Sequence, residues 1–275
     1  MEITLQRKYD GLRADLLAKK RLAIAFSGGV DSSLLLKVAH DVLPGQVLAL
    51  TADASFISRR ESQQAHELAS ALGVEHIILP FNEKNIPHFT DNPADRCYHC
   101  KHALFSAFLR VAKQHDMLHL ADGSNTDDVG DYRPGRRALH ELGIISPLQN
   151  AQLSKQEIRA LSRTLGLPSW NQQAAACLAS RIPYGQTISR AKLNMIEEAE
   201  QALMAYGFRQ FRVRHHGDIA RIEVAPDERR LFGDADMMDA IASRLKELGF
   251  AYVTLDMEGY RMGSLNQALE KKSEQ

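Results

Sequence analysis

Short apolar runs alternate with segments of helical periodicity over the first 165 residues, and this alternation constrains the fold more than any other feature. The apolar runs have the length of buried strands and stand at residues 22–26, 47–50, 75–79 and 117–121, with a shorter run at 144–145. Helical segments follow them at about 31–42, 58–72, 98–115 and 154–165, two of which open on capping boxes, Ser58 with Glu61 and Ser154 with Glu157. Such repeated β-α-β units predict an α/β fold with a doubly wound parallel sheet, whose ligands bind at the carboxyl ends of the strands.

The pattern changes near Pro168. Residues 168–188 show little periodicity, which indicates an ordered loop or linker. The order that follows is helix, strand, strand, helix, strand, at about 189–206, 210–214, 220–224, 236–248 and 252–255. We therefore predict a larger domain over residues 1–167 and a smaller α+β domain over residues 168–275.

Charge and cysteine content exclude several classes of protein. Lys and Arg number 34, as do Asp and Glu, so the formal net charge is zero. This balance argues against affinity for nucleic acid or a membrane through bulk positive charge. Three cysteines are an odd number and too few for a disulfide-stapled secreted fold. With no signal-peptide pattern and no apolar run of membrane-spanning length, we expect a cytoplasmic protein with no stable nucleic-acid or membrane partner.

A glycine-containing loop between the first strand and the first sheet helix carries the strongest motif. Paired glycines let the backbone approach an anion, and the helix start offers unpaired amides and a favourable dipole. No lysine follows the glycines, so the loop is not a Walker A motif, and a tight turn that needs glycine is the alternative. The loop resembles the pyrophosphate loop (PP-loop) of ATP pyrophosphatases, which predicts ATP binding by Ser27, Gly28, Gly29, Val30, Asp31, Ser32 and Ser33.

Polar residues also follow the second and fourth strands. Asp53 lies where related enzymes surround the adenosine. Residues 122–128 offer acidic and hydroxyl groups that could hold ribose or a Mg²⁺ on pyrophosphate, and we select Asp128 as the nucleotide-site residue. Such polar clusters are also common in loops that bind nothing. We assign residues 122–128 to the nucleotide site because we expect them to lie beside the phosphate loop.

The three thiols are Cys97, Cys100 and Cys177. A Cys-x-x-Cys pair is compatible with zinc, with a redox pair or with an iron–sulfur cluster. Zinc would need a fourth ligand such as His99 or His102, whereas three thiolates with an open fourth position suit a [4Fe–4S] cluster. Three unconnected free cysteines are the remaining alternative.

Four separated motifs together resemble the LarE family of ATP-dependent sulfurtransferases, which act in nickel-pincer nucleotide biosynthesis: residues 27–33, 122–128 with 131–135, 177–185 and 259–266. The resemblance covers nearly the whole chain. It implies that a carboxylate of pyridinium-3,5-biscarboxylic acid mononucleotide is adenylated by ATP, with Mg²⁺, and then converted to a thiocarboxylate with release of AMP. It also implies a homo-oligomer, with a hexamer as one form.

The resemblance implies two possible sulfur sources. In one branch the cysteine at Cys177 donates its own sulfur and becomes dehydroalanine. In the other, a [4Fe–4S] cluster on Cys97, Cys100 and Cys177 carries the sulfide, which permits repeated turnover. The Cys-x-x-Cys pair has no use in the sacrificial route, so we predict the cluster.

Polar residues of the second domain are candidates for substrate contacts. Arg212, Arg214 and Arg261 could hold the substrate phosphate or a free carboxylate, and Ser180 and Arg181 could orient or activate the thiol of Cys177. Glu223 matches a position that lies near a metal or substrate phosphate in the family. The alternative is that such alternating charges face solvent from half-buried strands.

Three other functions compete with this interpretation. A tRNA thiolase shares the loop and a three-cysteine cluster, but the balanced charge and the lack of further cysteines disfavour it. Ammonia-using amide synthetases, such as GMP and NAD synthases, have no use for the cysteines. A non-catalytic nucleotide-binding regulator would release no pyrophosphate.

Overall fold

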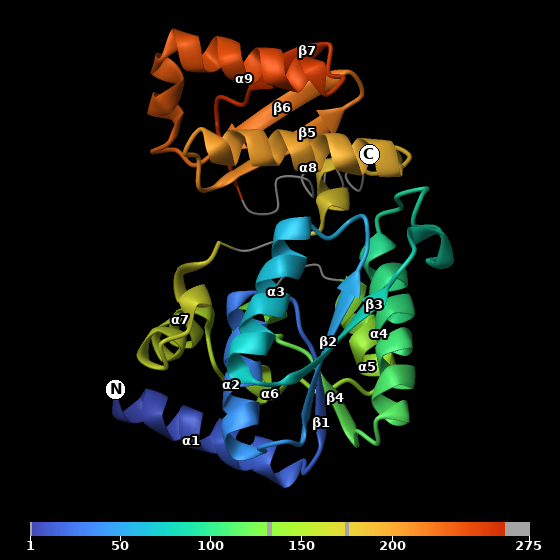
Figure 1. Cartoon of the computed structure of the whole chain (residues 1–275), viewed down its shortest axis with the longest axis vertical. Coiled ribbons are helices and arrows are strands. Elements are labelled where there is room, and N and C mark those ends of the chain that lie inside the picture. Colours follow the sequence, from blue (N-terminus) through green and yellow to red (C-terminus); the bar gives the residue numbers. More distant parts are fainter. Residues whose placement is uncertain (1, 131–133, 174–175, 262–275) are drawn as a thin grey trace. The chain divides into compact units, whose positions relative to one another are not determined.

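The computed structural model describes residues 2–130, 134–173 and 176–261 (Figure 1). Two stretches of the predicted motifs, residues 131–133 and 262–266, lie outside the described residues. The chain forms two compact units, one of Met1–Pro87 with Asp95–Ala175, the other of His88–Ala94 with Ala176–Gln275. The second unit therefore includes a short segment from the first half of the chain.

The first unit is built on a parallel sheet of the order β3-β2-β1-β4. Its strands are β1 (Leu22–Ala25), β2 (Val47–Asp53), β3 (Glu75–Pro80) and β4 (His119–Ala121). Its helices are α1 (Ile3–Ala18), α2 (Val30–Val42), α3 (Arg59–Leu72), α4 (Arg96–Gln114), α5 (Pro134–Glu141), α6 (Pro147–Asn150) and α7 (Lys155–Thr164). The predicted α/β fold with a parallel sheet is confirmed.

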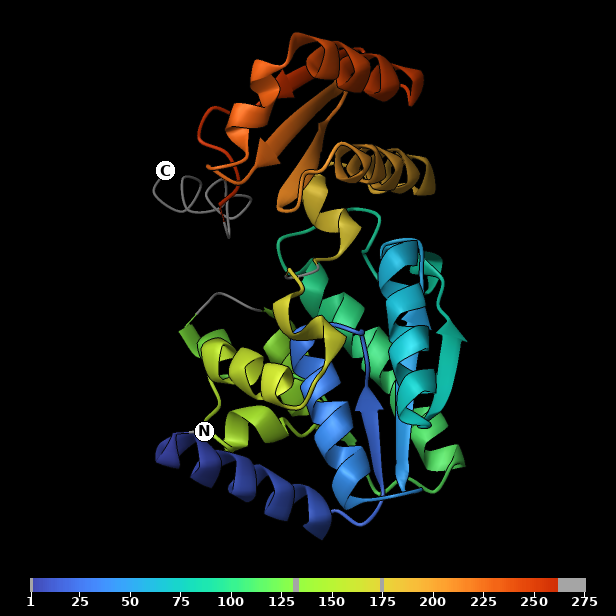
Figure 2. The ribbon, with the colours of Figure 1, turned by 60° about the vertical axis from the view of Figure 1, so that its left-hand side comes forward.

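Alternate residues of the sheet pack into two separate cores, as a doubly wound fold requires. On one face Leu22 and Ile24 of β1 pack with apolar residues of α1, α2, α3 and α7. On the other face Ala23 packs with residues of α4 and α5, including Phe105 and Leu139. Figure 2 shows α2 and α3 on one side of the strands and α4 on the other. The sheet is therefore buried on both faces, and its carboxyl edge is left for a ligand.

Local signals predicted these elements unevenly. The capping box of Ser154 with Glu157 is confirmed in full, whereas at Ser58 the structure shows one of its two bonds, from the Glu61 amide to Ser58 Oγ. The run at residues 144–145 makes only one parallel bridge, from Ile145 to Ala121, because the chain enters α6 two residues later. Helix α1 was not predicted from the sequence.

The second unit is a three-stranded sheet covered by two helices. Its elements are α8 (Arg190–Ala205), β5 (Phe211–His216), β6 (Ile219–Val224), α9 (Ala235–Glu247) and β7 (Tyr252–Leu255). Strands β5 and β6 are antiparallel, and β7 pairs with β6 in parallel. Phe211, Val213 and Ile222 pack with residues of α8 and α9 in one core. The intervening residues of β5 and β6 therefore point to the opposite, polar face of the sheet.

The connection before α8 contains two short 3-10 helices, Pro168–Asn171 and Leu178–Arg181. Cys177 immediately precedes the second of them. No helix in residues 2–130, 134–173 or 176–261 is long and apolar enough to cross a membrane.

Candidate functional site

The phosphate loop joins β1 to α2 at the carboxyl edge of the first sheet. Gly28 has a φ of +71°, and a Cβ added to it would lie 2.9 Å from the backbone nitrogen of Ala65 in α3. Both the left-handed backbone and the close approach exclude any larger residue here. Gly29 caps α2 without a side chain, so the first-turn amides of Val30, Asp31 and Ser32 have no acceptor within the helix. The loop therefore presents amides that suit a phosphate group.

The serines of the loop are engaged in its own hydrogen bonds. Ser27 Oγ lies 3.2 Å from Ser32 Oγ, and the Ser32 hydroxyl also accepts from the Ser27 amide at 3.3 Å. The buried hydroxyl of Ser33 donates to the Gly28 carbonyl at 3.2 Å. These bonds fix the loop conformation, and the first-turn amides of α2 are left as the groups that can receive an anion.

A lysine that sequence reasoning missed lies beside the loop. The ammonium of Lys155, at the start of α7, forms an ion pair with the carboxylate of Asp31. Asn125 Nδ2 donates to the other Asp31 oxygen at 3.2 Å. Lys155 thus supplies a cation at a phosphate loop that has no lysine in its own sequence.

The loop after β4 packs directly against the phosphate loop. A Cβ on Gly123 would lie 3.0 Å from the Ser32 amide nitrogen, so the two segments are in close contact. The Asp122 carboxylate accepts from Ser124 Oγ at 2.5 Å and from Ser146 Oγ at 2.6 Å. Asp128 Oδ2 accepts from the Asn125 amide at 3.0 Å. The structure thus brings the second predicted nucleotide segment to the first, although its carboxylates also stabilise their own loop.

At the neighbouring strand end, Asp53 is exposed and its carbonyl accepts from the Phe81 amide at 2.7 Å. Below it, Thr51 Oγ1 donates to the Phe26 carbonyl at 2.6 Å and lies 2.8 Å from His76 Nε2. The threonine hydroxyl has one proton, so His76 Nε2–H is the donor in the second bond. Burial, with repulsion from His66, lowers the pKa of His76.

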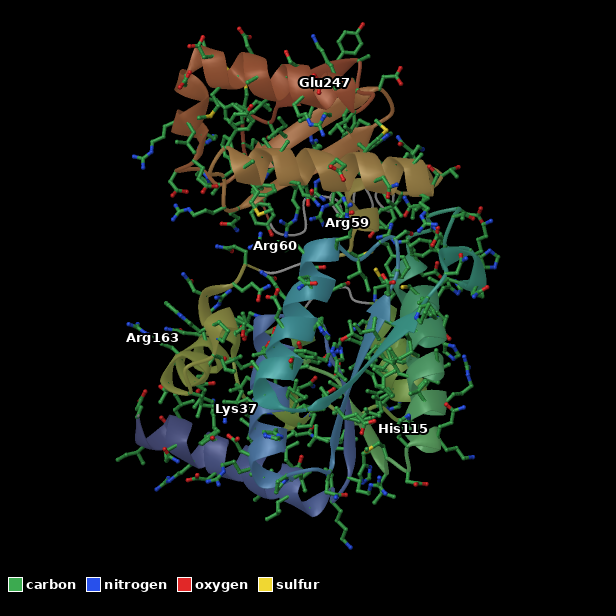
Figure 3. The ribbon with its side chains drawn as sticks, viewed as in Figure 1. Lys37, Arg59, Arg60, His115, Arg163 and Glu247 are labelled. Carbon is green, nitrogen blue, oxygen red and sulfur yellow. The ribbon has the colours of Figure 1, made fainter. Side chains whose placement is uncertain are left out.

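Two further cations at this edge were not selected from the sequence. Arg59 and Arg60 begin α3, and Figure 3 shows them at the end of that helix. Both side chains are exposed.

In the second unit, arginines line the polar face of the sheet. Arg212 pairs in register with Glu223, and Arg214 with Arg221. Arg214 Nη2 and Arg221 Nη2 bind the two oxygens of Glu223 at 2.8 and 2.7 Å. Arg214 is 6% exposed and Glu223 is 1% exposed, so neither is a solvent-facing strand residue. The face therefore carries more positive than negative charge.

The Cys177 segment packs on this arginine-lined face. Arg214 Nη1 donates to the Ser180 carbonyl at 2.9 Å. Arg181 Nη1 donates to the Ala176 carbonyl at 2.7 Å, to the Cys177 carbonyl at 3.2 Å and to Ser180 Oγ at 3.0 Å. The structure thus brings the predicted residues Cys177, Ser180, Arg181 and Arg214 together.

Glu200 of α8 completes this arrangement and was missed by sequence reasoning. Its carboxylate accepts from Nε and Nη2 of Arg181 at 2.8 and 2.9 Å, and its Oε1 also accepts from the Val213 amide at 3.1 Å. Glu200 therefore connects helix α8, strand β5 and the segment that carries Cys177. Its place in an amphipathic helix gave no local signal of this role.

Arg212 and the segment that leads to Arg261 both lie near the end of β6. The Arg212 guanidinium lies 5.0 Å from the centre of the Tyr260 ring, and the Tyr260 amide donates to the Val224 carbonyl at 2.8 Å. Burial, with repulsion from Arg181, lowers the pKa of Arg212. Arg261 pairs with Glu258 at 2.5 Å.

The other two thiols belong to the first unit. Cys97 lies in the first turn of α4 and Cys100 at the start of the second, and a spacing of three residues places them on one side of the helix. Cys97 is exposed and Cys100 is half-buried. Within the described ranges, no three His, Cys, Asp or Glu side chains gather closely enough to hold a metal ion. The structure thus places two of the predicted ligands together, and the third in the other unit.

Comparison with known proteins agrees with these motifs. The asparagine synthase family model matches residues 9–106, which contain the phosphate loop. A relative from Lactiplantibacillus plantarum named pyridinium-3,5-bisthiocarboxylic acid mononucleotide synthase is 38% identical over 98% of this chain and 97% of its own length. The chain belongs to the LarE family. It is thus an ATP-dependent sulfurtransferase with a PP-loop domain.

Two other relatives differ in how much of this chain they match. An uncharacterized protein of Synechocystis, slr1717, is 40% identical over 97% of this chain and all of its own length. A GMP synthase of Chlamydia muridarum is 26% identical over 58% of this chain, and that match covers 34% of its own length. Similarity to the LarE relatives thus spans both units, whereas similarity to this GMP synthase is partial.

Proposed function

We propose that this LarE-family protein converts the carboxylates of pyridinium-3,5-biscarboxylic acid mononucleotide to thiocarboxylates, at the expense of ATP. The observation that carries the proposal is the packing of the Cys177 segment on an arginine-lined sheet face. The substrate carries a phosphate and two carboxylates, and guanidinium groups bind such anions in bidentate geometry. The near full-length similarity to a synthase of the bisthiocarboxylic nucleotide supports the same substrate.

The first unit has the groups for activation. A substrate carboxylate oxygen attacks the α-phosphorus of ATP, the bond to the bridging oxygen breaks, and pyrophosphate leaves. The loop amides of Val30, Asp31 and Ser32, with the Lys155 ammonium, stabilise the negative charge of that leaving group. Mg²⁺ would supply further charge neutralisation, and carboxylates such as Asp128 offer the oxygen ligands it prefers.

The second unit has the groups for substrate binding and sulfur transfer. Arg212, Arg214 and Arg261 would hold the phosphate and the unreacted carboxylate. Arg181 fixes the peptide groups on both sides of Cys177. We propose that its guanidinium also activates the thiol, as a nearby cation does for other reactive cysteines.

For the sulfur source we propose a [4Fe–4S] cluster on Cys97, Cys100 and Cys177. The donor set fits, since none of the three cysteines takes part in a disulfide and none is fully buried. Such a cluster would supply a sulfide that is replaced between turnovers. In the alternative, the Cys177 thiolate displaces AMP to form a thioester, and loss of its α-proton with cleavage of its Cβ–S bond leaves dehydroalanine and the thiocarboxylate. We further propose a cytoplasmic homo-oligomer, a hexamer being one form to test by light scattering.

The decisive experiment is anaerobic reconstitution with iron and sulfide, followed by assay with ATP and the biscarboxylate nucleotide. We expect a broad cluster absorbance near ~400 nm that is lost in Cys97→Ala, together with AMP, pyrophosphate and thiocarboxylate formation. No absorbance, with a turnover-dependent loss of about 34 Da at Cys177 as the elements of H₂S, would establish the sacrificial route instead. Thiolation of tRNA but not of the nucleotide would contradict the proposed substrate.

A further inference from the structure

A short segment of the first half of the chain is anchored in the second unit. Residues His88–Ala94 group with Ala176–Gln275, although the chain on both sides of them belongs to the first unit. Phe89 and Asn92 of this segment are 1% and 0% exposed. The segment contains no helix or strand, so buried side chains and hydrogen bonds hold it in the second unit.

Asn92 provides the central contacts of this anchor. Its Nδ2 donates to the Ile182 carbonyl at 3.2 Å and to the Pro183 carbonyl at 2.8 Å. Its own carbonyl accepts from the Gly185 amide at 2.9 Å. Asn92 also has a φ of +53°, a left-handed conformation that asparagine tolerates better than most residues. One side chain thus binds two consecutive carbonyls, the first of them buried, while the backbone turns.

The residues that Asn92 binds directly follow the Cys177 segment. Ile182 is five positions after Cys177 (182 − 177 = 5), and those positions include the 3-10 helix Leu178–Arg181. A backbone bond from the Ile188 amide to the Thr90 carbonyl, 2.9 Å long, extends the same contact.

The residues that follow Asn92 lead directly to the other two thiols. Cys97 is also five positions away (97 − 92 = 5), in the first turn of α4. Five residues span at most about 18 Å even when fully extended. Asn92 therefore lies between the two cysteine-bearing segments along a short path of chain and hydrogen bonds, and that path holds whatever the relative placement of the units.

We propose that Asn92 is a positioning residue, which latches the approach to α4 onto residues 182–188 and thereby limits the separation of Cys177 from Cys97 and Cys100. The inference rests on the proposed function, in which one site uses all three thiols. Without the latch, the segment before α4 would lose its side-chain hydrogen bonds to the Ile182 and Pro183 carbonyls, and the short path between the thiols would be broken.

The test is thiol cross-linking in the full-length, reduced and iron-free protein. A short bis-maleimide is added, and peptide mass spectrometry quantifies links from Cys177 to Cys97 or Cys100. We expect links in the wild type, and about tenfold fewer in Asn92→Leu, which lacks both side-chain hydrogen bonds. Labelling by a monofunctional maleimide should be unchanged, since it reports thiol exposure alone.

Two further variants separate the latch from overall stability. Inserting six Gly and Ser residues between Ala94 and Asp95 keeps the Asn92 contacts and lengthens the path, and we expect the same loss of links. Asp116→Ala serves as the control, because Asp116 also has positive φ but lies in the turn after α4, away from the anchor.

Equal cross-linking in all variants, or none in the wild type, would overturn the inference. Latch-dependent cross-linking in a protein that neither binds iron nor forms thiocarboxylate would contradict the proposed function and leave the latch standing. Thiocarboxylate formation, with cross-linking that is equal in the wild type and the latch variants, would support the proposed function and overturn the latch.

Discussion

The carboxylate of Glu200 receives two nitrogens of Arg181, Nε at 2.8 Å and Nη2 at 2.9 Å, and both side chains are largely removed from solvent. Arg181 uses its third nitrogen on the Ala176 and Cys177 carbonyls. The ion pair therefore fixes, from helix α8, the arginine that holds the backbone around Cys177.

Replacement of Glu200 by Gln should lower stability and sulfur transfer together. Removing one partner of a buried pair leaves a buried cation uncompensated, which costs about 3 kcal/mol. We expect urea unfolding to show that loss, and thiocarboxylate formation to fall at least about tenfold through misplacement of Cys177. ATP binding, measured by calorimetry, should be unchanged. Arg244→Gln, which removes an exposed ion pair with Glu247, is the matched control and should alter neither quantity.

Gly28→Ala should weaken ATP binding by more than its effect on stability explains. The new Cβ would lie 2.9 Å from the Ala65 nitrogen, so either the loop or α3 must move. Gly45→Ala is a close control, because Gly45 has nearly the same φ, +70°, and has no atom within 4 Å of an added Cβ. In both variants the alanine adopts a left-handed backbone, which lowers the stability by about 1 kcal/mol. Only Gly28→Ala should also weaken ATP affinity, at least about tenfold. Equal ATP affinities in the two variants would show that the loop tolerates the displacement.

The fold was predictable where local pattern determines burial. The apolar runs that became β1, β2 and β3 are bounded by capping residues or glycines, and all three became strands of the parallel sheet, β1 and β2 in its interior and β3 at its edge. The run at residues 144–145 failed as a strand because periodicity does not show that α6 begins at Pro147. Helix α1 escaped prediction because its buried face is sparse: only Leu12 and Leu16 are fully buried.

The residues of the candidate site also fall into two groups, those that the sequence predicts and those that it does not. The phosphate loop is a contiguous motif, so its residues could be selected directly. Lys155, Glu200 and Asn92 could not, because each acts through a partner distant in the chain; Lys155, for example, is 124 positions from Asp31. Asparagine, lysine and glutamate are also common on surfaces, and only the folded contacts distinguish these three.

Acid should destabilise the protein partly through His76. Burial lowers the pKa of His76 in the folded state, so the unfolded chain binds a proton that the folded chain does not. The resulting stability is present at neutral pH and is lost as the pH falls through the unfolded pKa of about 6.5. We expect His76→Gln to lose less unfolding free energy than the wild type between about pH 7.5 and 5.5. His88→Gln, at a largely exposed side chain, should leave the wild-type pH profile intact.

Lys155→Met should weaken ATP binding by about tenfold, since charge-assisted contacts to phosphate and to Asp31 are lost together. Lys37→Met is the matched control, because Lys37 pairs with Asp41 on the same helix α2 as Asp31, but lies away from the phosphate loop (Figure 3).

The double variant Lys155→Met with Asp31→Asn tells the two roles of the lysine apart. If Lys155 only neutralises Asp31, removing both charges restores wild-type affinity. If its ammonium also contacts phosphate, the double variant stays weak, and this is the result we expect, because the loop itself contains no lysine. Wild-type affinity in Lys155→Met alone would show that the ion pair has no part in nucleotide binding.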